Sequence, residues 1–244
     1  MSVKMIKTYT LWIFYSLGSL LISFWLAWQL SAQVNFLYPL WYSALDIDQT
    51  IEQTMPKHLY KREFIATDSN EHQRLFAEIV TSIQNNGNGL EAIKFYSISG
   101  KELGLLLTES EIVHLKDVAA LVDILGWFCL ATFIFCLIVL AAIIIFRTAM
   151  PSTKKLLVSI LSAVAVIVVL IVALGAKKFF YWLHTVVFPD NHQWFFYYEE
   201  SLMSTLMKAP DLFAPISLQL LMLGIFIWVV HLMIVRKFGR FRTV

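Results

Sequence analysis

Four long apolar runs constrain the fold of this chain more than any other feature. They lie at about residues 11–30, 124–146, 156–176 and 216–235. A helix needs about 20 mostly apolar residues to cross a bilayer, and each run has this length. The chain is 59% hydrophobic and 15% charged, whereas soluble proteins are about 45–50% apolar and about 25% charged. We therefore predict an all-α membrane protein with four transmembrane helices, which forms a single integral membrane domain over residues 1–244.

The first run has the properties of a retained anchor, not those of a cleaved signal peptide. Its apolar stretch is about 20 residues long, whereas the apolar core of a signal peptide has about 7–15. A cut after Ala32 would also place Leu30 where signal peptidases require a small residue. We expect the first run to remain in the membrane.

Basic residues beside the apolar runs predict the orientation in the membrane. They are Lys4 and Lys7 before the first run, Arg147, Lys154 and Lys155 between the second and third, and Arg236, Lys237, Arg240 and Arg242 after the fourth. Basic residues accumulate on the cytoplasmic side of membrane proteins. Both termini are therefore expected in the cytoplasm of a bacterial cell, with regions 31–123 and 179–215 outside. Lys177 and Lys178 are exceptions that can reach lipid headgroups. The net charge of +2 gives no reason to expect a nucleic acid partner.

Region 31–123 is expected to form a small α+β extracytoplasmic unit between the first two spans. Apolar residues recur every four positions within 70–84, which predicts a helix. Asn and Gly fill residues 85–89 and indicate a turn, and residues 95–107 predict a short hairpin. A lone core of this size is only marginally stable, so we expect the unit to rest on the membrane and the spans.

Thr108 and Glu111 have the spacing of a helix capping box. No Gly or Pro follows before Gly126, so the helix is expected to run without a break into the second span. From residue 108 to residue 146 it would be about 58 Å long, against a hydrocarbon core of about 30 Å. Its first turns should therefore stand at headgroup level, and these turns carry His114 and Asp117.

Residues 179–198 of the second outer region are unusually rich in aromatic side chains. Trp and Tyr favour the membrane interface, which accounts for the rings. It does not account for His184 and His192 among them. The region is also long for a simple connection, and long ordered loops are frequently functional. We expect an ordered loop with a functional role.

Few reactive side chains are expected on the outer side of the membrane. They are Glu111, His114, Asp117, His184, His192, Glu199 and Glu200. Both cysteines, Cys129 and Cys136, lie inside the second apolar run, so thiol chemistry is not expected. The nucleophile elbow, zinc-protease, Walker and dinucleotide motifs are all absent. Histidine acid–base chemistry or a metal site remains.

Asp117 follows His114 by three residues and therefore shares its helix face. It could fix the tautomer of the imidazole, or it could simply favour the start of the helix dipole. For a metal, His114, His184 and His192 could supply three nitrogen ligands. Their spacing matches no known metal pattern, so we expect neither a metal nor another cofactor. His58 and His72 are expected at the surface. His231 lies one turn from the cytoplasmic end of the fourth span, where packing or snorkelling accounts for it.

Two groups of residues resemble a bacterial family of four-helix membrane proteins that includes the lipoprotein intramolecular transacylases. The run Glu111-x-x-His114-Leu115-x-Asp117-Val118 is similar to the family signature E-x-x-H-[LM]-x-D-V. The second group comprises His184, Phe188, Trp194-Phe195-Phe196, Leu202, Pro210 and Phe213. It departs from the usual F-H-x-x-F-F, because Leu183 precedes the histidine and Val187 replaces the first phenylalanine of the closing pair.

The resemblance implies a specific reaction. Such enzymes move the sn-2 acyl chain of a diacylglyceryl-cysteine lipoprotein to its N-terminal amine, which gives a lyso-form lipoprotein. The family's catalytic pair corresponds to His114 and His184. We expect Glu111 and Asp117 to orient this pair, and Trp194 to help exclude water. Diacylglyceryl lipoproteins and membrane lipids would be the partners at the outer face of the bacterial cytoplasmic membrane. No cofactor is implied, and no oligomeric state is assigned.

Two alternatives remain open from the sequence. One is a membrane-anchored sensory or binding protein, with region 31–123 as the receptor. The other is a zinc-dependent membrane hydrolase, which would carry about one equivalent of metal and lose activity on chelation.

Overall fold

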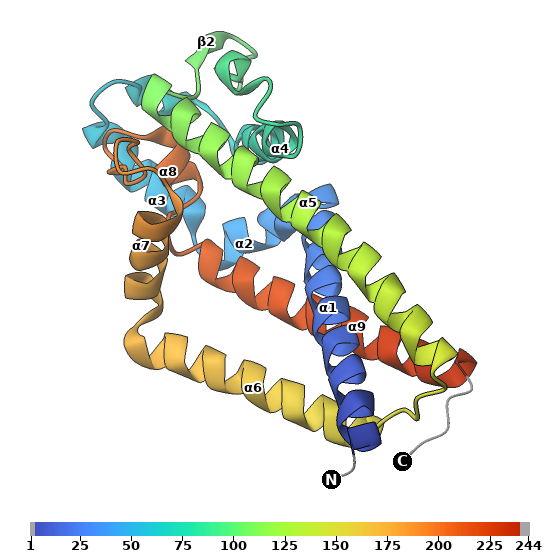
Figure 1. Cartoon of the computed structure of the whole chain (residues 1–244). Coiled ribbons are helices and arrows are strands. Elements are labelled where there is room, and N and C mark those ends of the chain that lie inside the picture. Colours follow the sequence, from blue (N-terminus) through green and yellow to red (C-terminus); the bar gives the residue numbers. More distant parts are fainter. Residues whose placement is uncertain (1–2, 240–244) are drawn as a thin grey trace. The chain divides into compact units, whose positions relative to one another are not determined.

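The computed structural model describes residues 3–239, although not the side chains of residues 3–8 and 153. Four of its helices are long and apolar enough to span a membrane (Figure 1). These helices are α1 (Val3–Gln33), α5 (Glu109–Ile145), α6 (Thr153–Leu174) and α9 (Phe213–Phe238). The four predicted spans are thus confirmed. The side chains of Lys4 and Lys7, and the whole of Arg240 and Arg242, lie outside the described residues.

The chain divides into two compact units. The first comprises Met1–Gln29, Leu125–Gly175 and Gln219–Val244, and it holds most of the four long helices. The second comprises Leu30–Ile124 and Ala176–Leu218, and it holds both predicted outer regions. The single domain expected over residues 1–244 stays a prediction.

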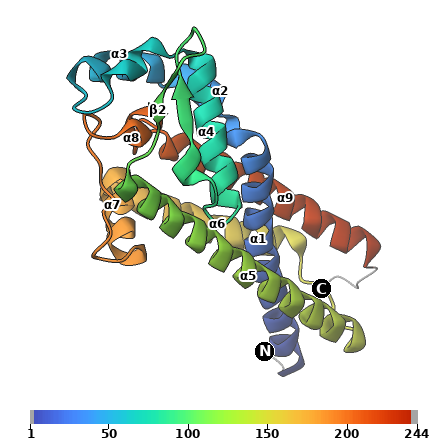
Figure 2. The same cartoon turned by 90° about the horizontal axis from the view of Figure 1, so that it is seen from above.

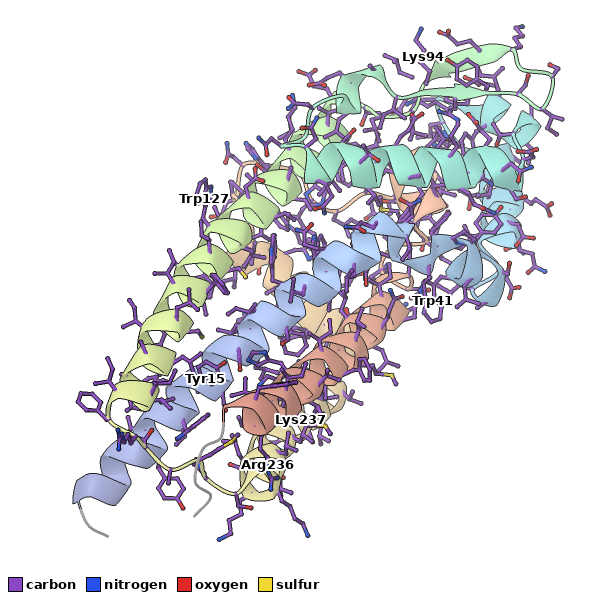
Figure 3. The ribbon with its side chains drawn as sticks, turned by 90° about the vertical axis from the view of Figure 1, so that its right-hand side faces the viewer. Tyr15, Trp41, Lys94, Trp127, Arg236 and Lys237 are labelled. Carbon is purple, nitrogen blue, oxygen red and sulfur yellow. The ribbon has the colours of Figure 1, made fainter. Side chains whose placement is uncertain are left out.

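In the first unit, α1 lies between α5 and α9 (Figure 3). Close approach is possible because glycines stand at both contacts. A Cβ atom at Gly18 would lie 2.5 Å from Sγ of Cys136 on α5, and one at Gly224 of α9 would collide with the Phe24 ring of α1. On the opposite face of α5, Trp127 is 72% exposed and points outward, as expected of a lipid-facing side chain.

Buried side chains form two clusters around α1. One cluster comprises Trp12, Tyr15, Cys136, Val139, Ile143 and Met150, and the other comprises Leu20, Leu156, Trp228 and Leu232. Polar contacts add to the packing between α1 and α9. The Trp228 indole donates to the backbone oxygen of Ser16 at 3.1 Å, and the Tyr15 hydroxyl lies 3.0 Å from Nε2 of His231. His231 is therefore part of this packing, and both cysteines are free thiols.

The second unit begins with short helices and ends its first half with a hairpin. Its elements in order are η1 (Asn35–Leu37), α2 (Tyr38–Ala44), α3 (Ile47–Thr54), η2 (Met55–Lys57), η3 (Arg62–Ala66), α4 (Ser69–Gln84), η4 (Leu90–Ala92), β1 (Lys94–Tyr96) and β2 (Glu102–Leu105). The strands are antiparallel, with Phe95 opposite Gly104. The predicted helix and hairpin are confirmed, whereas α2 and α3 were not predicted.

Helix α4 supports the hairpin. Asp68 caps its start by accepting from the backbone N–H of Glu71 at 2.9 Å, and the Glu71 carboxylate in turn accepts from the N–H of Tyr96 on β1 at 2.7 Å. Figure 2 shows the hairpin running beside α4. On the other side, Phe76 of α4 stacks on Tyr38 of α2 with ring centroids 4.0 Å apart. The first outer region therefore has its own layered core.

The expectation that His72 lies at the surface is wrong. Its side chain is buried between two hydroxyl groups, with the Tyr42 oxygen 2.8 Å from Nδ1 and the Thr67 oxygen 2.6 Å from Nε2. Thr67 donates its one hydroxyl proton to the backbone oxygen of Phe64. It must therefore accept from Nε2–H of His72, and Nδ1 accepts from Tyr42. Both imidazole nitrogens are satisfied.

His58 is likewise fully buried, against expectation. Its Nδ1 accepts from the backbone N–H groups of Tyr60 and Lys61 at 3.2 and 3.1 Å. Polar sequence neighbours suggested exposure for both histidines. In the structure those neighbours are exposed or half-buried, whereas both imidazoles are buried. Nε2 of His58 has no hydrogen-bond partner within the described residues.

The capping box at the start of α5 is confirmed. Glu111 accepts from the N–H of Thr108 at 2.6 Å, and the Thr108 hydroxyl accepts from the N–H of Glu111 at 3.4 Å. The helix then continues unbroken to Ile145, as predicted.

The second outer region is not simply a loop. Residues Ala176–Val187 form helix α7, and Leu202–Leu206 form the short helix α8. Gly175 and Pro189 bracket α7, and neither Gly nor Pro interrupts it, so the helix is the expected local outcome. Helix α8 lies beside α3 (Figure 1). Lys177 pairs with Asp211 at 2.8 Å, which gives this exception to the predicted charge distribution a protein partner.

Candidate active site

His114 and His184 come together within the second unit. His114 stands on the second turn of α5 and His184 on the third turn of α7. Their ring centroids are 6.0 Å apart and the ring planes are inclined by 34°. Two histidines that are 70 residues apart in the sequence thus face each other, and their role as a catalytic pair stays a prediction.

Aromatic rings enclose both imidazoles. The Phe188 ring lies 4.9 Å from His114 and 5.2 Å from His184, measured between centroids. Phe196 lies 6.0 Å from His114, and Trp194 lies 5.2 Å from His184. Trp194 therefore stands where a wall against water would be needed.

One hydrogen bond fixes the tautomer of His184. Its Nδ1 lies 2.8 Å from the backbone oxygen of Phe180, one turn earlier on α7. A carbonyl oxygen can only accept, so Nδ1 carries the proton and Nε2 keeps its lone pair. Burial lowers the pKa of His184 below its usual range, outweighing the opposite effect of the Phe180 bond. The ring is therefore neutral at pH 7, with Nε2 available as a base.

His114 has an open hydrogen-bonding position. The side chain is 8% exposed, and its Nδ1 atom is buried without a hydrogen-bond partner among the described residues. An unsatisfied buried polar atom costs about 1–3 kcal/mol, so such atoms are uncommon unless a ligand or function accounts for them. The open nitrogen lies on the residue that faces His184.

The two carboxylates predicted to orient the histidines are bonded to other groups. Asp117 binds His192, with 2.7 Å between Oδ2 and Nδ1. Glu111 is buried and accepts from the Ser201 hydroxyl and from the N–H of Met203. Glu111 thus joins the start of α5 to the start of α8. Among the described residues, neither carboxylate is hydrogen-bonded to His114 or His184.

Ser201 was missed by sequence reasoning. It caps α8 by accepting from the N–H of Ser204 at 3.0 Å, and it donates to Glu111. The spacing of Ser201 from Ser204 is a local signal for a helix start. No local pattern, however, connects it with a carboxylate 90 residues earlier.

No group of three or more His, Cys, Asp or Glu side chains within the described part of the chain is arranged to hold a metal ion. His114, His184 and His192 do not form such a group. The donor set of the site therefore suits acid–base chemistry better than metal binding.

Comparisons with known proteins point in one direction. A family model described as lipoprotein intramolecular transacylase Lit matches residues 11–210. An in meso structure of the membrane integral lipoprotein intramolecular transacylase Lit from Bacillus cereus gives a TM-score of 0.65 at 16% identity, covering 95% of each chain. A variant with one histidine replaced by arginine gives 0.64 at 15% identity, covering 95% of this chain and 91% of that one. At such identities the structural likeness shows a shared fold. No curated protein matches the chain.

Proposed function

Because the chain belongs to the family of lipoprotein intramolecular transacylases, we propose that it moves the sn-2 acyl chain of a diacylglyceryl-cysteine lipoprotein to the N-terminal amine. It is an acyltransferase and a multi-pass membrane protein. The product is a lyso-form lipoprotein with an N-linked acyl chain. The observation that carries the proposal is the pair His114 and His184, which face each other inside an aromatic enclosure.

We assign His184 as the base. The lipoprotein α-amine has an ordinary pKa of about 8 and must lose a proton as it becomes an amide. Nε2 of His184 has the free lone pair that this transfer needs, because Nδ1–H is engaged by Phe180. The lowered pKa of His184 keeps the base neutral at pH 7. The resulting imidazolium can then protonate the departing glyceryl oxygen.

His114 is assigned to the ester oxygen. As the amine attacks, the carbonyl oxygen gains negative charge, and a nearby imidazole N–H can donate to it. The buried ring of His114 faces His184 and has a nitrogen without a protein partner, which suits this role. Amine and ester belong to one molecule, so correct positioning supplies much of the acceleration.

Location on the outer side of the bacterial cytoplasmic membrane follows from the substrate and from the basic residues beside the spans. Arg236 and Lys237 stand in the last turn of α9, on the end expected to be cytoplasmic (Figure 3). Both termini would then be inside, and His114 and His184 would lie at the depth of the glyceryl ester. Diacylglyceryl lipoproteins are the proposed partners.

Mass spectrometry of an N-terminal lipopeptide tests the proposal. The chain is expressed in cells that make diacyl lipoprotein but cannot N-acylate it, beside His114→Ala and His184→Ala. We expect one acyl chain on nitrogen at unchanged total lipid mass, and loss of this product in both variants. Loss of one acyl mass with a free amine would instead indicate a hydrolase. Unmodified diacyl lipopeptide throughout would contradict the proposal and favour the sensory alternative.

A further inference from the structure

The segment that covers the two histidines alternates between an inner and an outer face. We call residues 192–198 the strap. His192, Trp194, Phe196 and Tyr198 are half-buried, whereas Gln193, Phe195 and Tyr197 are exposed. Alternation of this kind is the signature of an extended chain with one face against the protein. The strap connects α7 with α8, and Figure 1 shows it as the orange segment between them.

The four inner residues have different partners. Trp194 and Phe196, in the middle, contact His184 and His114. His192 and Tyr198, at the ends, are hydrogen-bonded to the surrounding fold. The strap is therefore held at its ends while its middle covers the catalytic pair.

Its two ends are not held equally. At the far end the Tyr198 hydroxyl donates to Ala209 at 2.8 Å and its backbone oxygen accepts from Thr205 at 2.9 Å. The backbone oxygen of the next residue, Glu199, accepts from the N–H of Leu59 at 2.8 Å. At the near end, the backbone N–H of His192 donates to the backbone oxygen of Pro189 at 3.0 Å, within the same turn of chain. The bond from His192 to Asp117 is the one hydrogen bond described within residues 3–239 that ties this end to α5.

The near tether lies directly beside the reacting groups. Asp117 is one turn beyond His114 on α5, so the two share a helix face. Trp194 lies only two residues from His192 and covers His184, the proposed base. Loss of the tether would free the end of the strap that shields this base, while Phe196 stays near the firmly held end.

We propose that His192, through its bond with Asp117, is a positioning residue that keeps the strap closed and directs the acyl group to the amine instead of to water. The inference rests on the proposed function. With the strap open, Nε2 of His184 takes a proton from water, and the hydroxide oxygen attacks the sn-2 ester carbonyl. The carbonyl–oxygen bond to glycerol breaks and the proton passes to the glyceryl oxygen. The products are a free fatty acid and a monoacyl lipoprotein with a free amine.

The decisive variant is His192→Leu, matched with His192→Asn. Leucine fills similar volume without a donor, whereas the amide nitrogen of asparagine reaches roughly the position of Nδ1 and can still bind Asp117. Asp190→Asn is the control, because it changes an exposed charge in the same segment. Each purified protein is incubated with a synthetic diacylglyceryl lipopeptide in ¹⁸O-water.

We expect His192→Leu to raise the ratio of free fatty acid to N-acyl product about tenfold, with one ¹⁸O in the fatty acid. His192→Asn and Asp190→Asn should keep the ratio close to that of the unaltered protein. A purely structural role would lower both products together and leave the ratio unchanged. An unchanged ratio in His192→Leu overturns the inference, provided that the unaltered protein forms N-acyl product.

Hydrogen exchange separates this result from a failure of the proposed function. In the absence of substrate, His192→Leu should speed amide exchange in residues 190–197 and leave residues 199–206 protected. If the unaltered protein forms no N-acyl lipopeptide, the proposed function fails on its own. If exchange in residues 190–197 does not change, the tether fails, whatever the reaction proves to be.

Discussion

His72 is buried and His184 is half-buried, and the structure gives the two side chains different hydrogen bonds. His72 uses both nitrogens, accepting from Tyr42 and donating to Thr67. His184 uses only Nδ1, which donates to Phe180. Burial lowers the pKa of both side chains. The free Nε2 of His184 suits the proposed base because it stands beside His114. An unpartnered nitrogen alone does not mark a base, since Nε2 of the buried His58 also has no hydrogen-bond partner within the described residues.

The largest expected effect is on the rate of N-acyl formation when His184 is replaced. His184→Ala should lower the rate of N-acyl formation by about 10²–10⁴-fold, because a positioned general base is lost. The melting temperature should fall less than in a His72 variant, since the half-buried side chain makes a single hydrogen bond, to its own helix. Rate and melting curve are measured on the same purified sample. A fall in melting temperature that matched that of a His72 variant would break the comparison.

Replacing the structural histidine should have the opposite signature. His72→Ala leaves two hydroxyl groups without their partner and opens a cavity, which should cost about 3 kcal/mol of stability. The protein that remains folded should keep its rate of N-acyl formation. Denaturant unfolding gives the first quantity and the rate per folded molecule gives the second. An intact unfolding curve with lost activity would assign His72 to the reaction.

Acid should weaken the fold through His72. Burial lowers its pKa to about 4, against about 6.5 for an unfolded histidine. Between these values the unfolded chain binds the extra proton, so stability is full above about pH 6.5 and falls as the pH drops towards 4. The contribution lost between pH 7 and pH 5 is about 2 kcal/mol. A His72→Gln variant, compared by unfolding at both pH values, should show a flatter dependence by this amount.

The smallest expected effect is the loss of stability when one hydrogen bond to His72 is removed. Tyr42→Phe removes one hydroxyl and leaves Nδ1 of His72 unpartnered, with the ring otherwise in place. The expected loss is about 1 kcal/mol, the net value of one buried hydrogen bond. No new activity should appear, because this nitrogen lies in the core of the outer region, away from the strap. Acyl hydrolysis gained by this variant would show that an open nitrogen alone creates a base.

Much of the fold could be predicted from patterns of neighbouring residues in the sequence. The four spans, the capping box of Thr108 with Glu111, and the helix beginning near Asn70 all depend on neighbouring residues, and each is present. His114 and His184 were singled out by motif and membrane depth, and the structure brings their rings within 6.0 Å of each other. His58 and His72 were misplaced because polar neighbours do not reveal which way a side chain points.

Pairings across long stretches of chain could not be predicted. His192 meets Asp117 from 75 residues away, and Ser201 meets Glu111 from 90 residues away. Both contacts depend on how α7 and the strap lie against α5. The spacing of residues in the sequence does not predict that arrangement. The alternation of half-buried and exposed residues along the strap could be recognised only in the structure, where the inner residues have partners.

The link between Glu111 and Ser201 also has a consequence for biosynthesis. A ribosome delivers α5 with His114 long before it delivers α7, the strap and the start of α8. A nascent chain that ends before residue 176 contains His114 but not His184. It also lacks the strap and Ser201, the hydrogen-bond partner of Glu111. On the proposed function, we therefore expect acyl transfer only after synthesis has passed residue 201, so that an unfinished polypeptide would leave the acyl chains of nearby lipoproteins in place.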